Sequence, residues 1–261
     1  MARAARRSLS LVGRRSESIA RQAGEMTLLL KGIVLAVARG QVPLRSVLDQ
    51  VYWMGVQSLP IVLVTSTLSG VVTSQQGGYQ FTGAVPLYVL GSVVASSIIL
   101  ELGPVMTAVV LIGRVGARIT AEFGTMQVSE QIDALHSLNR DPVRVLAAPR
   151  VLGGIIAVPI LVAFADCIGV VSGMLAANLT VGLSPEAFFY GARLYWHKWD
   201  LFYSLLKALS FGFVIPFIAC YMGFQTRGGA EGVGRATTSS VVFMTLAVLI
   251  LDALFPPLLL N

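Results

Sequence analysis

The chain has 261 residues, of which 55% are hydrophobic and only 12% are charged, and its formal net charge at pH 7 is +6. A soluble globular domain carries about 25% charged residues, so this composition excludes an ordinary water-soluble domain. Several apolar runs reach the roughly 20 residues that cross a bilayer as a helix, and the alternating short segments of a membrane β-barrel do not occur. The sequence therefore predicts an all-α polytopic membrane protein.

Residues 1–50 form a basic tail ahead of the membrane-spanning domain. Next to membrane spans, such a tail more often anchors on anionic lipid than binds nucleic acid, so we expect no nucleic-acid partner. We expect residues 1–16 to be disordered or surface-bound, and a helix from about Ser18. The apolar run Met26–Ala38 is too short to span and contains Lys31, which predicts an interfacial amphipathic helix. The Arg- and Ser-rich start leaves an organelle transit peptide as an alternative.

Five membrane spans are expected in the remaining domain, residues 51–261. They lie at about residues 53–74, 85–112, 151–177, 201–224 and 239–259. Tyr52 and Trp53 begin the first span, as interfacial aromatic residues do, and its many small residues favour close packing against other helices. We expect loops at 75–83 and 178–200, and a Gly-rich turn at 226–238.

The distribution of basic residues predicts the orientation of these spans. Five spans place the two termini on opposite sides of the membrane. The segments on the N-terminal side hold sixteen of the 19 Lys and Arg residues, whereas the loops on the other side hold only Arg193 and Lys198. Cytoplasmic loops carry the excess of positive charge, so the N-terminus is predicted to be cytoplasmic and the C-terminus to lie outside.

The polar segment between the second and third spans predicts a short cytoplasmic helix at about residues 127–138. Apolar residues recur on one face of it, at Val128, Ile132, Leu135 and Leu138. Glu130, Gln131 and Asp133 lie mostly elsewhere around the helix. A helix that rests on the bilayer is usually basic, so this acidic one favours docking to a protein partner over a passive loop. Asp141 is predicted to cap the next helix, with Pro142 in its first turn.

Four charged residues lie within predicted spans: Glu101, Asp166, Lys207 and Asp252. An unpaired charge is costly in a bilayer, so such residues face the protein interior or water, and often pair. For Glu101 we favour the lining of a polar transport cavity over a structural salt bridge. Lys207 fits either that cavity or snorkelling to the nearby end of its span. Asp166 and Asp252 are expected to be structural.

No motif for soluble enzyme chemistry is present. The chain lacks the G-x-x-x-x-G-K-[ST] pattern, so it is not expected to bind ATP through a P-loop. His136 and His197 fall on opposite predicted sides of the membrane, so they cannot share a metal. We therefore expect a non-enzymatic chain with no cofactor or metal of its own.

Several motifs resemble the MlaE/YrbE permeases, the membrane subunits of ABC transporters that work with MCE proteins. These motifs are ELGPV from Glu101, GRVGARITAEFGTM from Gly113, SEQIDAL from Ser129, NRDP from Asn139, GVGRATTSSVV from Gly232 and AVLILDAL from Ala247. The resemblance covers about Tyr52 to the end of the chain. It implies a homodimer in a bacterial inner membrane, or in a plastid envelope. It also implies a separate cytoplasmic ATPase that binds the ATP, a hexamer of MCE subunits on the periplasmic side, and a phospholipid substrate moved between membranes.

The resemblance also implies roles for particular residues. Glu101, Lys207 and Arg235 match positions on the lipid path of the family. The short cytoplasmic helix matches the coupling helix that docks into the ATPase, and its candidate contact residues are Val128, Glu130, Gln131, Asp133, Leu135 and Asp141. Some relatives carry Arg where this chain has Leu100, so that head-group contact is absent or supplied elsewhere. The alternatives are a permease for sterols or other hydrophobic solutes, and a non-transporting scaffold for the MCE ring.

Overall fold

The computed structural model describes residues 2–81 and 85–259, and all regular secondary structure in these ranges is helical. Five helical stretches are long and apolar enough to cross a membrane, namely Leu44–Gln80, Val89–Val128, Val143–Val181, Lys198–Phe224 and Gly229–Leu259. The predicted all-α polytopic fold with five spans is thus confirmed. Each stretch extends beyond its predicted span at one end or both, because the helix continues past the apolar run; the second stretch, however, begins at Val89 and not at residue 85.

Three of the five stretches contain short π-helical segments: one in the first, two in the second and one at the start of the third. The first consists of α2 (Leu44–Val51), η1 (Tyr52–Val56) and α3 (Leu59–Gln80). The second consists of α4 (Val89–Ser97), η2 (Ile98–Leu102), α5 (Gly103–Leu111), η3 (Ile112–Gly116) and α6 (Ala117–Val128). The third joins η4 (Val143–Ala147) to α8 (Ala148–Val181), and the last two are α10 (Lys198–Phe224) and α11 (Gly229–Leu259). π-Helical turns occur often at functional sites, and η2 carries Glu101.

Several segments predicted as irregular are helical. The helix α1 spans Ala2–Ala38, so it begins well before Ser18, and α3 continues to Gln80 through the loop expected at 75–83. The loop expected at 178–200 contains α9 (Pro185–Leu194), whose first turn is capped where Ala187 N donates to Ser184 Oγ at 3.2 Å. Much of the expected Gly-rich turn belongs to α11. Residues 75–80 lack a strong apolar signal, yet their Gln and Gly residues are tolerated in a helix that packs against others. Residues 82–83 of the expected loop lie outside the described residues.

Small residues set the close packing of the long helices. Gly70 of α3 lies against the backbone carbonyl of Gly169 in α8, where an added Cβ would clash. Ser66 Oγ donates to the carbonyl of Ala165 across the same interface. Gly154 of α8 and Gly212 of α10 likewise approach one another through their backbones. This stripe of Gly and Ser lets the helices approach at backbone distance, as the small residues of the first span predicted.

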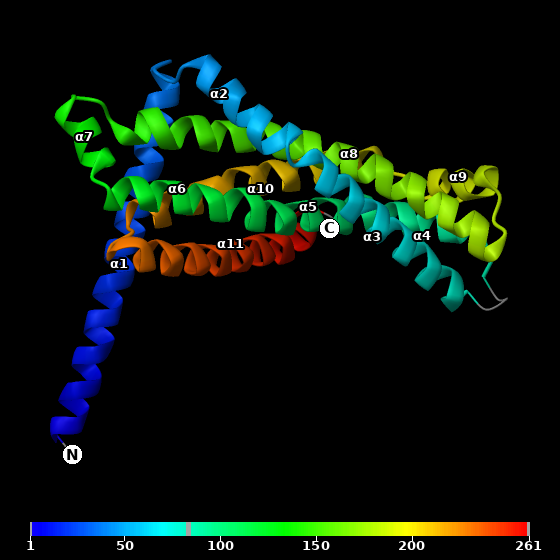
Figure 1. Ribbon diagram of the computed structural model, residues 1–261. Helices are drawn as coiled ribbons and strands as arrows, with labels where there is room; N and C mark the ends of the chain where they lie inside the picture. The colour runs from blue at the N-terminus through cyan, green and yellow to red at the C-terminus, as the bar shows by residue number, and fades with distance from the viewer. Residues whose placement is uncertain (1, 82–84, 260–261) are drawn as a thin grey trace.

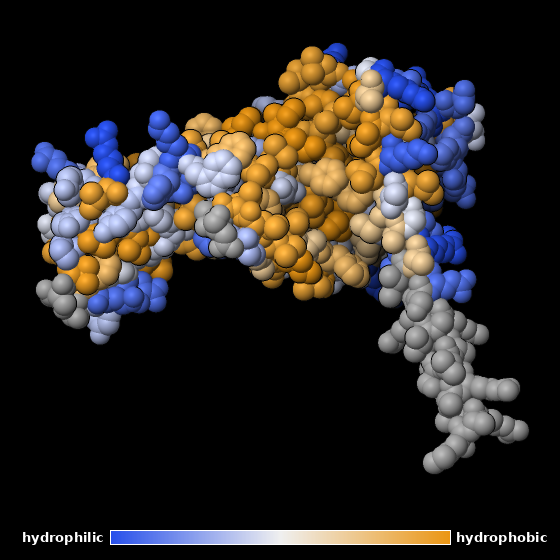
Figure 2. All heavy atoms as spheres, turned by 180° about the vertical axis from the view of Figure 1, so that it is seen from behind, coloured by the Kyte–Doolittle hydropathy of each residue, from blue (hydrophilic) through white to orange (hydrophobic). Residues whose placement is uncertain are grey.

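The short helices mark the two ends of the bundle. α1 crosses one end, where α7 (Gln131–Ser137) also lies, and α9 lies at the opposite end (Figure 1). A broad apolar belt separates more polar surfaces at these two ends (Figure 2). On the inner face of α1, Leu29, Ile33 and Ala36 are buried against the bundle. The N-terminal helix and the helix between spans two and three therefore share one end of the molecule.

Candidate functional site

Three charged side chains from three different helices meet inside the spanning region. Lys207 of α10 has no exposed side-chain surface, and its Nζ lies 2.6 Å from Asp252 Oδ1 of α11. The same ammonium pairs with Glu101 Oε2 of η2. We call Glu101, Lys207 and Asp252 the ion cluster. With all three groups ionised, its formal charge is negative, because two carboxylates share one ammonium.

A proline explains why the ammonium is held at this place. Pro104 has no N–H, so the carbonyl of Leu100, four residues earlier, loses its usual helical partner. Lys207 Nζ donates to that carbonyl at 3.1 Å. The lysine thus satisfies a freed backbone acceptor in addition to two carboxylates, which compensates for its removal from water.

A second polar pair borders the ion cluster. Ser204 Oγ, one turn before Lys207 on α10, donates to Asp166 Oδ2 of α8 at 2.9 Å. Gly103 packs directly against this carboxylate, leaving no room for a side chain. The Tyr203 ring lies 5.5 Å from Lys207 Nζ, in cation–π range. Polar groups from α8, α10 and α11 are therefore gathered around the turn η2 and the helix start that follows it.

The members of the ion cluster differ in their access to the surface. The Glu101 side chain is 48% exposed, whereas that of Asp252 is 18% exposed and that of Lys207 is fully buried. Beside η2, a groove of about 430 Å³ lies between α3 and α4, and polar side chains line much of it. Its lining residues include Ser69, Thr73, Gln76, Gln80 and Leu102, the neighbour of Glu101. A half-exposed carboxylate within a span needs water, a polar ligand or another subunit over it.

The structure brings Lys207 and Asp252 together and places Arg235 apart from them. Lys207 is buried and paired, so it does not snorkel to the end of its span. Asp252, expected to be structural, shares the Lys207 ammonium with Glu101 and so belongs to the ion cluster. Arg235 lies at the other end of α11, about 25 Å along the helix from Asp252. There Arg235 pairs with Glu231 at 2.6 Å.

The predicted coupling helix is shorter than its apolar stripe indicated. α6 ends at Val128, and Glu130 adopts a left-handed backbone conformation (φ 58°) before α7 begins at Gln131. Val128 therefore does not lie on the same helix as Ile132 and Leu135. The backbone break was not visible in the sequence, because a left-handed Glu is uncommon.

The exposed groups around α7 remain available to a partner. Asp133 is exposed, Leu135 is half-buried, and Ile132 packs inward. Gln131 and Glu130 are exposed as well. The N–H of Val143 donates to Asp141 Oδ1 at 2.9 Å, so Asp141 caps the following helix as predicted. The outward face of α7 is thus mostly acidic and polar.

An ion network braces the helices on either side of α7. Glu122 of α6 pairs with Arg118 at 2.8 Å and with Arg150 of α8 at 3.1 Å. The Arg118 guanidinium lies 4.2 Å from the centre of the Trp53 ring in η1, and that of Arg150 lies 4.6 Å from the Phe123 ring. The network connects the second, third and first spans at the end of the bundle that carries α7.

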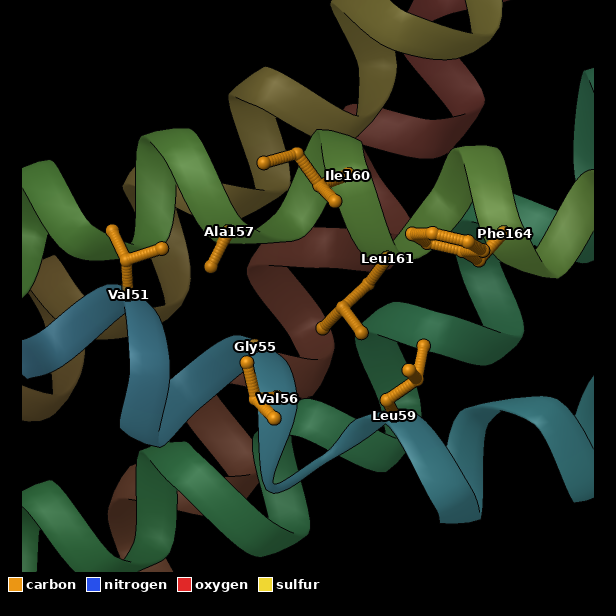
Figure 3. Close-up of a pocket in the computed structure, with 8 residues that line it drawn as sticks. All are labelled: Val51, Gly55, Val56, Leu59, Ala157, Ile160, Leu161 and Phe164. Carbon is orange, nitrogen blue, oxygen red and sulfur yellow. The ribbon is translucent and has the colours of Figure 1, made fainter. Parts of the chain in front are cut away.

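A purely apolar pocket lies away from these polar sites. It sits between α8 and the turn η1, where Gly55 and Ala157 leave space, and Val51, Leu161 and Phe164 close its sides (Figure 3). Its volume is about 150 Å³. No charged or polar side chain lines it, so it offers nothing for recognising a head group.

Comparison with known proteins finds close relatives among transport proteins. The family model described as "Permease MlaE" matches residues 47–257. A probable ABC transporter permease of Rickettsia conorii is 38% identical over 247 residues, covering 95% of each chain. A probable ABC transporter permease of Synechocystis is 37% identical over 84% of this chain and 83% of its own. The chloroplastic protein TRIGALACTOSYLDIACYLGLYCEROL 1 of Arabidopsis thaliana is 36% identical over 84% of this chain and 63% of its own.

Proposed function

Because the chain belongs to the MlaE permease family of ABC transporters, we propose that it moves phospholipid between the inner and outer membranes of a bacterium. A permease of this kind is a transport subunit that works with an ATPase, and we assign ATP binding and hydrolysis to that separate chain. A periplasmic MCE-domain protein is proposed to exchange the lipid with it. The Arabidopsis relative carries trigalactosyldiacylglycerol in its name, which favours a substrate built on diacylglycerol.

The ion cluster is the observation that carries this proposal. In a soluble protein such a salt bridge could be purely structural. Here, however, the Glu101 carboxylate is 48% exposed although it lies in a membrane span. Bare lipid chains cannot solvate it, so it belongs in a cavity that admits water or polar head groups. The adjoining groove between α3 and α4 offers apolar and uncharged polar walls for a lipid. We propose that Glu101 and Lys207 form the polar part of the lipid path. We assign Arg235 to the cytoplasmic end of that path.

We propose that two copies pack together through their first and fifth spans. In the most apolar window of α11 only 11% of the residues are buried, and in the first span 22%, against 61% in α10. The fifth span carries Asp252 of the ion cluster, and residues of the first span line the groove beside η2. A two-fold dimer through these faces would enclose a lipid-sized cavity with a Glu101 from each copy, open toward the periplasm.

We propose that α7 couples this cavity to the ATPase. Its exposed acidic face would dock into the cytoplasmic subunit, and the Glu122 network would pass the movement into the spans. The shared location of α1 and α7 agrees with a cytoplasmic placement of both, since the basic tail favours the cytoplasmic leaflet. On this basis the N-terminus is cytoplasmic, the C-terminus is periplasmic, and α1 lies in the membrane interface.

Reversal of the acidic charges tests the coupling step. The double variant Glu130→Lys and Asp133→Lys should lose co-purification with the ATPase. Two exposed positive side chains would then repel the ATPase surface that the acidic side chains of the wild type attract. The variant Glu17→Lys and Glu186→Lys makes the same charge change away from α7 and serves as the control. Unchanged co-purification of the Glu130 and Asp133 variant would contradict docking through α7.

The lipid itself tests the substrate. Native mass spectrometry of the purified complex should detect bound phospholipid, and the amount should fall on Glu101→Gln substitution. A co-purifying sterol or other hydrophobic solute would replace the phospholipid in the proposal. Absence of any bound lipid, with transport unaffected by Glu101→Gln, would support a scaffold for the MCE ring instead.

A further inference from the structure

A second groove lies between α1, α10 and α11, and it shares no lining residue with the groove beside η2. Its volume is about 460 Å³, and its walls are mostly apolar, formed by Met26, Ile218, Phe243, Leu246 and Ile250 among others. Phe243, Leu246 and Ile250 recur along one face of α11, and each side chain is at least half exposed. The groove therefore presents a continuous apolar strip within the depth of a membrane span.

One end of this groove is polar and basic. A neighbouring hollow of about 430 Å³ is lined by Arg21, Glu25 and Arg227, and it shares Gln22 and Gln225 with the apolar groove. The two hollows thus adjoin, and together they offer a charged mouth and an apolar body. Arg227 is exposed and forms no ion pair with the side chains that the structure describes.

Hydrogen bonds hold the walls of the groove together. Tyr221 Oη of α10 donates to the carbonyl of Gln22 in α1 at 3.5 Å, and Gln225 Nε2 donates to Glu25. Glu25 also accepts from Arg21 Nε at 3.0 Å. The one carboxylate at the mouth is therefore already engaged by two donors, and the mouth keeps an excess positive charge from its two arginines.

We propose that this groove binds one anionic glycerophospholipid as a resident lipid, with the phosphate at Arg21 and Arg227 and an acyl chain between α10 and α11. The basic mouth complements a phosphate, and the apolar body lies where the acyl chains of the same leaflet would lie. The site is separate from the proposed substrate path. Gln225 lies about 27 Å along α10 from Lys207, close to the opposite end of that helix.

The test uses the full chain in nanodiscs of phosphatidylcholine with a minor fraction of phosphatidylglycerol. Native mass spectrometry counts retained phosphatidylglycerol, and a phosphatidylglycerol with a photoreactive acyl chain maps the contact. We expect cross-links to the segment 218–225 and to α11. The variant Arg21→Gln with Arg227→Gln should lower the apparent affinity about tenfold or more, since each basic group near a membrane surface contributes to anionic lipid binding.

Two matched controls separate this site from a general effect of charge or bulk. Arg39→Gln with Arg45→Gln removes the same charge elsewhere near the same end of the bundle and should retain the lipid. Ala247→Phe fills the apolar groove and should abolish the mapped cross-link, whereas Val171→Phe on the outer face of α8 should not. Equal retention and equal cross-linking in all four variants would overturn the proposal. Cross-linking of Phe243 to a second copy of the chain would also overturn it, because another subunit would then fill the groove.

Discussion

Replacement of Lys207 by Met should destabilise the protein strongly, because it removes the only cation of the ion cluster. Removing one partner of a buried ion pair costs about 3–5 kcal/mol, since the other charge stays buried and unpaired. That range applies to Asp252, whose side chain is only 18% exposed. The unpaired Glu101 carboxylate adds little to the loss of stability, because its side chain is 48% exposed and water can solvate it. The loss of the hydrogen bond to the Leu100 carbonyl adds about 1 kcal/mol.

The expected total loss of unfolding free energy is therefore about 4–6 kcal/mol. Equilibrium unfolding in detergent micelles measures it, and Lys31→Met on the exposed side of α1 is the matched control, with an expected change below about 0.5 kcal/mol. Combining Lys207→Met with Asp252→Leu should recover much of the loss, because no buried charge then remains unpaired. A loss below 1 kcal/mol for Lys207→Met, or no recovery in the double variant, would mean that Lys207 does not compensate a buried carboxylate.

Three further predictions test the packing and the bracing of the bundle. Gly70→Leu should destabilise the protein by about 1–3 kcal/mol in the same unfolding measurement, because its side chain would collide with the Gly169 backbone; Gly113→Leu, with open space around it, should cost less than 1 kcal/mol. Glu122→Gln should cost about 1 kcal/mol, since Glu122 is 35% exposed and solvent screens its two ion pairs; an unchanged stability would mean that the network braces nothing. The same Glu122→Gln variant should also weaken ATP-dependent lipid transfer while ATPase co-purification stays intact, and loss of co-purification would place Glu122 in the docking surface instead.

The five spans were predictable because long apolar runs are a local property of the chain. Their ends were less so: Gln75 and Gln76 carry no apolar signal, yet α3 continues through them to Gln80. The break before α7 depends on one backbone angle at Glu130, which no residue pattern announces. The corrected boundaries therefore concern places where packing or a single dihedral angle outweighs composition.

The ion cluster was only half predictable for a different reason. Its charges could be seen in the spans, but the cation and Glu101 are 106 residues apart, and only the packed helices show which charges meet. Pro104 was a usable signal, because a proline in a span frees the carbonyl four residues earlier, here that of Leu100. Nothing in the sequence indicated that Lys207 would satisfy it, or that Asp252 would join the same ammonium.

The proposed place of Glu101 on the lipid path is tested most directly by lipid transfer in the reconstituted complex of this chain with its ATPase. Transfer of a labelled phospholipid from proteoliposomes to an acceptor is measured with ATP, for the wild type and for Glu101→Gln. Glu186→Gln, an identical change in α9, is the control. We expect ATP-dependent transfer that falls at least tenfold in Glu101→Gln and is unchanged in Glu186→Gln, with ATPase association intact in both. Equal transfer by Glu101→Gln and the wild type would contradict the placement of Glu101 on the lipid path.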